Sequence, residues 1–170
     1  MKKLLSARAY LLPQLGAALL IGLALRWVVG LEPVWWLVWL APVPLLCLAY
    51  RASWGRALAL TALAAGIGAS VNAPYYLQVM PLPAVAAVVL AQTLAWVFVV
   101  GATRRLVVRY RAWWTVFAYP TLWVAVDTLL ATVLPDGNWG SVAYSQATFL
   151  PALQVAALLG VAGVLFLVAL

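Results

Sequence analysis

The chain has 170 residues, of which 68% are hydrophobic and 8% charged, and its mean hydropathy is +1.10. Soluble domains carry roughly 25% charged residues, so this composition excludes a soluble globular protein and indicates an integral membrane protein. Apolar stretches of helical length recur along the chain, whereas the short segments of alternating polarity that build a membrane β-barrel do not. We therefore predict an all-α, polytopic transmembrane helix bundle.

Charges and prolines divide the chain into six predicted helices with short connections. The N-terminal segment has basic residues before an apolar run, as a signal peptide does. That run continues to Val29, which is long enough to cross a bilayer, so we predict an uncleaved first helix. The helices form a single transmembrane domain over residues 1–170, and they cover about residues 10–29, 34–50, 57–78, 83–102, 112–134 and 150–170.

Nine of the ten basic residues fall on one side of this threaded arrangement, and only Arg26 falls near the other. The positive-inside rule then predicts that both termini are cytoplasmic. The net charge of +7 is mostly a topology signal. Anionic lipid head groups suit the arginines of residues 104–111 better than nucleic acid does. The nine residues are Lys2, Lys3, Arg8, Arg51, Arg56, Arg104, Arg105, Arg109 and Arg111.

Polar side chains inside the apolar spans are costly in lipid, so each one marks helix-to-helix hydrogen bonding or a functional site. Gln92 lies near the middle of the membrane. Asp127 needs a cation or a water-filled cavity, and Arg26 is the only cation on its side, so we hypothesise that the two pair. Four helices bring a polar side chain to the same depth in the outer leaflet: Arg26, Asn72, Asp127 and Gln154.

Catalytic chemistry has few candidates in this sequence. The chain has no histidine and only three acids, so we predict no catalytic residue, no metal site and no cofactor. Cys47 lies in an apolar run with no base nearby, which predicts a buried, unreactive thiol. Small residues four apart predict close helix packing on two spans. They are Ala62, Gly66 and Ser70 on the third, and Ala152, Ala156 and Gly160 on the sixth.

The most polar stretch, PDGNWGSVAYSQ at residues 135–146, follows the fifth predicted helix on the outer side. Its Pro, Asp, Gly and Asn are turn residues, but a turn does not need its aromatic rings. Aromatic side chains suit the boundary between acyl chains and water. Trp139 and Tyr144 are therefore candidate lipid-binding residues. Gln146 is a third, because its amide can bond a lipid ester or phosphate, although it can equally cap the sixth helix.

The last fifty residues carry a more specific pattern, in which Trp123 and Asp127 precede Trp139, Tyr144 and Gln146. This pattern resembles the membrane domain of bacterial apolipoprotein N-acyltransferase. That family shows a Trp with an acid four positions on, an outer loop with Trp, Tyr-x-Gln and a further Gln, then Gly-x-x-Gly before Phe-Leu. The usual Glu is Asp127 here, and Leu130 stands where the family has Arg. The matching residues are Trp123, Asp127, Trp139, Tyr144, Gln146, Gln154, Gly160, Gly163, Phe166 and Leu167.

The resemblance implies a multi-pass protein of the bacterial inner membrane that holds phospholipid for the N-acylation of lipoproteins. In the family, a periplasmic nitrilase-like domain carries the catalytic Glu, Lys and Cys, and nothing in these 170 residues corresponds to it. We therefore expect no catalysis by this chain alone, and a lipoprotein substrate reached only through a nitrilase-like domain or subunit. Two alternatives stay open: a small membrane transporter or transporter subunit, and a scaffold for a separate nitrilase-like subunit.

Overall fold

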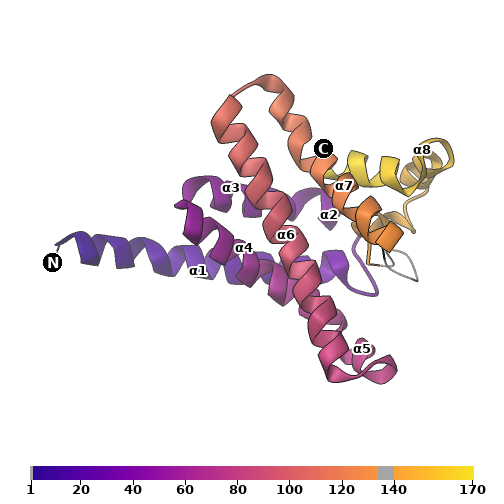
Figure 1. Ribbon diagram of the computed structural model, residues 1–170, viewed down its shortest axis with the longest axis horizontal. Helices are drawn as coiled ribbons and strands as arrows, with labels where there is room; N and C mark the ends of the chain where they lie inside the picture. Colours follow the sequence, from indigo (N-terminus) through magenta and orange to yellow (C-terminus); the bar gives the residue numbers. More distant parts are fainter. Residues whose placement is uncertain (1, 134–139) are drawn as a thin grey trace.

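A computed structural model describes residues 2–133 and 140–170, with side chains from residue 11 onward (Figure 1). All regular elements in these ranges are helical, which confirms the predicted all-α bundle. Three short 3₁₀ segments connect the longer helices: Ser70–Asn72 (η1), Trp113–Phe117 (η2) and Val142–Gln146 (η3). The α-helices are Lys2–Val29 (α1), Leu37–Leu40 (α2), Pro42–Arg51 (α3), Trp54–Ala69 (α4), Ala73–Val79 (α5), Leu82–Tyr110 (α6), Ala118–Val133 (α7) and Leu150–Ala169 (α8).

Five helical segments are long and apolar enough to cross a membrane, and a sixth is shorter. The shorter one is Leu37–Arg51, where a full span was predicted over residues 34–50. At roughly 1.5 Å per residue it is about 22 Å long, less than the ~30 Å hydrocarbon core. Pro42 begins a new helix there because it has no backbone N–H to continue the preceding one. The five longer segments are Leu11–Val29, Trp54–Val79, Leu82–Tyr110, Trp113–Val133 and Leu150–Ala169.

The helix α6 is longer than predicted and carries three arginines that the prediction placed in a loop. It continues to Tyr110, so Arg104, Arg105 and Arg109 lie on its last turns. Arginine is a good helix former, and cations near a helix C-terminus interact favourably with its dipole. Arg111 ends the helix in the left-handed conformation (φ 48°), and its N–H donates to the carbonyl of Val107 at 3.0 Å.

The most extensive helix contact joins α1 to α4, and two glycines let the backbones approach there. A Cβ on Gly22 would lie 2.9 Å from the Ala64 carbonyl oxygen and 2.9 Å from Ile67 Cβ. A Cβ on Gly68 would lie 2.8 Å from Leu25 Cβ. Neither position has room for a larger residue, so the two backbones approach through the glycines. In Figure 1, α6 crosses this pair.

The small residues that their spacing singled out pack only in part. Ala62 and Gly66 on α4 and Ser70 on η1 are half-buried, and the buried stripe of α4 lies beside them at Thr61, Ala64, Ala65, Gly68 and Ala69. On α8, Ala152 is buried, Ala156 is half-buried and Gly160 is exposed. Almost every residue of these segments is small or apolar, so spacing alone does not select the face that meets a neighbouring helix.

The helix α8 is broken at Gly160, which adopts φ 66° and ψ −170°. Only glycine tolerates this region without strain. The break brings the Leu159 side chain over Gly163, where a Cβ would collide with it. The Gly-x-x-Gly of the sequence is thus a break in the helix that needs both glycines. α8 packs on α7, and beyond the break its Phe166 ring stacks on Phe117 of η2 at 6.3 Å.

Cys47 is exposed on α3, so the prediction that it is buried was wrong. It lies in a shallow groove between α1 and α3 that apolar side chains line, together with Arg51. Apolar residues of a membrane protein face lipid as readily as they face the core, so the apolar run around Cys47 did not indicate which side it faces.

The contact between α1 and α4 gives the first prediction. Replacing Gly22 by Ala should lower stability, since a Cβ there meets the α4 backbone; overpacking typically costs about 1–3 kcal/mol. Gly16→Ala is the matched control on the same helix, where a Cβ meets nothing within 4 Å. Thermal unfolding in detergent should show a lower midpoint for Gly22→Ala and an equal or higher one for Gly16→Ala. Equal midpoints for the two variants would contradict the close contact.

Candidate functional site

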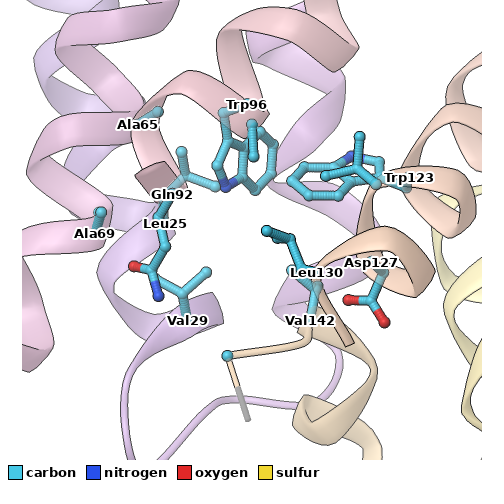
Figure 2. Close-up of a pocket in the computed structure, with 14 residues that line it drawn as sticks. Leu25, Val29, Ala65, Ala69, Gln92, Trp96, Trp123, Asp127, Leu130 and Val142 are labelled. Atoms are coloured by element: carbon cyan, nitrogen blue, oxygen red, sulfur yellow. The ribbon is translucent and has the colours of Figure 1, made fainter. Parts of the chain in front are cut away.

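A cavity of about 50 Å³ lies between α1, α4, α6 and α7 and is closed on one side by the chain around η3 (Figure 2). Alanines and Gly68 leave the space on the α4 side, since their side chains are too short to fill it. The walls are mostly apolar. Fourteen residues line it: Leu25, Val29, Ala65, Gly68, Ala69, Gln92, Ala95, Trp96, Trp123, Val126, Asp127, Leu130, Gly140 and Val142.

Two tryptophans form the end of the cavity nearest the middle of the bundle. Trp96 on α6 and Trp123 on α7 meet edge to face, with ring centroids 4.7 Å apart and planes at 76°. Both are buried, and Tyr119 adds a second edge-to-face contact to Trp123 at 6.3 Å. Such pairs are favourable beyond the area they bury. The indoles therefore act as a rigid spacer that keeps α6 and α7 apart.

Two polar side chains line opposite sides of the cavity, Gln92 from α6 and Asp127 from α7 (Figure 2). Asp127 is half-buried, four residues beyond Trp123 on the same helix face. Gln92 likewise precedes Trp96 by four residues. On both helices an indole lies deeper, and a polar group lies one turn closer to the η3 end. The cavity is thus apolar at its base and polar toward its opening.

Two further cavities adjoin the first one on opposite sides. A more polar cavity of about 280 Å³ shares Val29 and Gly140 with the first, and Asn72, Tyr75 and Tyr144 are among its lining residues. A small apolar one of about 10 Å³ lies on the other side of the tryptophans and shares Trp96, Trp123 and Val142 with the first.

Tyr144 occupies the position predicted for a lipid-binding aromatic. It lies on η3, is 48% exposed and lines the polar cavity together with Ser141 and Ser145. The exposed Tyr75 of α5 lines the same cavity. The ring of Tyr144 thus lies where the cavity meets the surroundings of the protein.

Gln146 is fully buried, at 0% exposure, and its amide is occupied by protein partners. Its Nε2 donates to the Trp35 carbonyl at 2.8 Å and to the Ser145 hydroxyl at 3.1 Å, and its Oε1 accepts from the Trp39 indole at 3.4 Å. Phe149 stacks on Trp35 at 4.1 Å beside it. Gln146 therefore anchors η3 to the start of α2, and does not reach lipid or cap α8 in this structure.

Asn72 also has a structural role. It is buried on η1, and its Nδ2 donates to the Val29 carbonyl at 2.8 Å and weakly to the Tyr76 hydroxyl at 3.5 Å. The Val29 carbonyl is one of the last on α1 and has no partner within that helix. Asn72 thus caps α1 and fixes the turn between α4 and α5, which agrees with helix-to-helix hydrogen bonding.

The remaining predicted site residues are dispersed. Arg26 and Gln154 are exposed on α1 and α8, and neither lines the cavity. The pairing of Arg26 with Asp127 stays a prediction. Trp139 lies outside the described residues. Of the four intramembrane polar residues, only Asp127 lines the apolar cavity, and Asn72 lines the polar cavity beside it.

Trp96 and Leu25 were not predicted as site residues. The sequence contained a clue to Trp96, because it is four residues from the polar Gln92, just as Trp123 is four residues from Asp127. The sequence contained no such clue to Leu25, since nothing distinguishes it from the leucines around it in α1.

The anchoring role of Gln146 gives the second prediction. Gln146→Leu keeps a similar volume but leaves the Trp35 carbonyl and Trp39 indole without this partner, at a cost of about 1–3 kcal/mol. Gln154→Leu is the matched control, because Gln154 is exposed on an apolar helix. The unfolding midpoint in detergent should fall for the first variant and hold or rise for the second. A midpoint unchanged by Gln146→Leu would show that the hydrogen bonds do not hold η3.

Comparison with known proteins identifies the family. Residues 17–170, nearly the whole chain, match the apolipoprotein N-acyltransferase N-terminal domain. Searches among curated proteins and among solved structures gave no match. The match includes the helices that line the cavity and the η3 segment that closes it. The chain therefore belongs to the apolipoprotein N-acyltransferase family through the N-terminal membrane domain of that family.

Proposed function

We propose that the chain holds a phospholipid, with part of an acyl chain in the apolar cavity and the polar end in the cavity beside Tyr144. The observation that carries this proposal is the sequence of cavities. An apolar space with an aromatic base joins, at Val29 and Gly140, a larger space lined by hydroxyl and amide groups. A phospholipid has the same order of chemistry along its length.

The size of the apolar cavity limits how much lipid it accepts in this conformation. A cavity of about 50 Å³ takes a few waters or a short piece of an acyl chain, not a whole chain. The remaining methylenes would lie along the exposed apolar faces of α7 and α8, where Leu129 and Leu158 point outward. A chain held at one end only exchanges readily with the bilayer, which suits a site that passes its lipid on.

A transporter is less well supported than a lipid-holding domain. A transport path needs polar side chains from one side of the membrane to the other. Here Gln92 and Asp127 lie on one side of the tryptophans, and the small cavity on the other side has mostly aliphatic and aromatic walls. Trp96 and Trp123 would block a solute at the middle of the bundle.

The family suggests the reaction in which the lipid is used. The acyl chain would pass to the amino terminus of a lipoprotein, in the inner membrane of a bacterium, on a nitrilase-like domain or subunit that supplies the catalytic residues. The chain would then act as the lipid-holding part of that enzyme, or as its scaffold. Asp127 and Tyr144 would contact the lipid near its ester groups.

Filling the cavity tests the proposal. Ala95 is half-buried on α6 and lines the cavity, so Ala95→Phe should place a ring where the acyl chain lies. We expect phospholipid that co-purifies in mild detergent to fall at least about twofold, since the ring takes up space of the size available. Mass spectrometry of extracted lipid per mole of protein measures this.

Ala91→Phe is the control for that variant. It lies one turn earlier on the same helix, is exposed and does not line the cavity. It should leave the bound lipid unchanged. Equal lipid in both variants and the parent protein, with unfolding midpoints also equal, would contradict the cavity as the lipid site.

The orientation of the bundle is part of the proposal. By the positive-inside rule, the nine cations at the end that holds Arg51 and Arg104 favour a cytoplasmic location for that end and an outer location for η3. Single cysteines at Glu32 and Ser53, both exposed, in a Cys47→Ser background should differ in labelling. A membrane-impermeant maleimide added to intact cells should label Glu32→Cys and spare Ser53→Cys. The reverse pattern would invert the bundle and place the η3 end in the cytoplasm.

A further inference from the structure

The arginine-rich end of the bundle holds a cavity of about 280 Å³, far from the lipid site proposed above. The start of α4 and the last turns of α6 form it. Its five lining residues are one tryptophan, one valine and three arginines: Trp54, Arg104, Arg105, Val108 and Arg109. One wall is therefore apolar and aromatic, and the other is cationic.

Arg104 is held in place by two contacts but keeps unused donors. Its Nη2 donates to the Ala52 carbonyl at 2.7 Å, and its guanidinium lies over the Trp54 ring, 5.4 Å from the centroid. Its Nε and Nη1 are buried and have no hydrogen-bond partner among the residues that the structure describes. Buried guanidinium donors without partners are rare, because each loses its hydration, so Arg104 keeps donors that a small movement of its side chain would offer to an acceptor in the cavity.

The positive charge around this cavity has no acidic side chain near it among the described residues. Arg105 and Arg109 are four residues apart on α6, a spacing at which like charges destabilise a helix. The chain has three acids, and the two that the structure describes, Glu32 and Asp127, belong to the opposite end of the bundle. No acid among the described residues lies at this end of the bundle, so the arginines there would attract an anion from outside the chain.

The aromatic residues around this cavity favour an anion that is part of a lipid. Trp113 is 82% exposed in the turn after α6, and Trp114 and Tyr110 are exposed beside it. Tryptophan and tyrosine gather at the level of lipid head groups. Trp54 and Val108 give the cavity an apolar wall that suits glycerol and the first methylenes, which a free phosphate does not have.

We propose that this cavity binds the head group of an anionic phospholipid. The phosphodiester oxygens accept from the guanidinium groups of Arg104, Arg105 and Arg109, and the glycerol lies against Trp54. Planar guanidinium groups suit phosphate oxygens, because two parallel N–H donors match two oxygens. The site is independent of the cavity at the η3 end and would anchor the arginine-rich end of α6 at the membrane surface.

Charge-matched double variants test this site. Arg105→Gln with Arg109→Gln removes two exposed arginines that line the cavity and spares Arg104, whose bond to Ala52 also supports the fold. Arg51→Gln with Arg56→Gln removes the same charge from exposed residues at the same end that do not line it. Thermal unfolding of both variants confirms that they are folded.

Native mass spectrometry in detergent, with phosphatidylglycerol or phosphatidylcholine added, measures the affinity. The parent protein should prefer phosphatidylglycerol. The Arg105/Arg109 variant should lose about tenfold or more of that affinity, since it loses two guanidinium groups that line the cavity and would bond the phosphate directly. The Arg51/Arg56 variant should stay within about twofold of the parent, because only a specific site distinguishes the two pairs.

Three outcomes would overturn the proposal. Equal losses in the two double variants would mean a diffuse attraction to positive charge. Equal affinity of the parent for both lipids would mean that the head-group charge is not recognised. Displacement of phosphatidylglycerol by inorganic phosphate at equal concentration would mean that the site is for free phosphate and not for lipid.

Discussion

The contact between Trp96 and Trp123 holds α6 and α7 apart, and the arrangement of the cavities depends on that separation. Two indoles meeting edge to face fill the middle of the bundle and leave an open space on the η3 side. On the other side of the cavity, Gly22 and Gly68 let α1 and α4 come together so closely that neither position has room for a Cβ. Small residues let α1 and α4 pack closely, whereas two large indoles lie between α6 and α7.

The two polar anchors at the η3 end complete this arrangement. Asn72 on η1 binds the last turn of α1, and Gln146 on η3 binds the segment before α2, so both amides hold a 3₁₀ segment in place. Buried amides are strong positional constraints, because a lost partner costs more than a made bond gains. Gly140 and Val142 are thereby held at the opening of the cavity. The residues predicted as lipid contacts divide accordingly, with Gln146 as support and Tyr144 at the surface.

Composition and periodicity were sufficient for the class of fold, because a chain this apolar has few structures available in lipid. They were less informative about which side of each helix faces the core. Cys47 was predicted to be buried and is exposed, and Ala62 and Gly66 are only half-buried, since apolar and small residues occur on every side of a membrane helix. The break at Gly160 required backbone geometry, although the spacing of Gly160 and Gly163 marked the place. Asp127 was a candidate site residue because of its charge alone. The place of Trp96 in the cavity wall could not be predicted, because it depends on contacts between helices that are distant in the sequence.

The central claim is that an acyl chain enters the space between α4, α6 and α7 as far as the tryptophan pair. The most direct test is a phospholipid with a photoreactive diazirine near the end of its acyl chain, irradiated with the protein in nanodiscs. Peptide mass spectrometry then locates the modified residues. The account predicts adducts on Trp96, Ala65 or Leu130, all of which line the cavity. Adducts found only on outward-facing residues such as Leu94 and Leu158 would show that the chain stays outside the bundle.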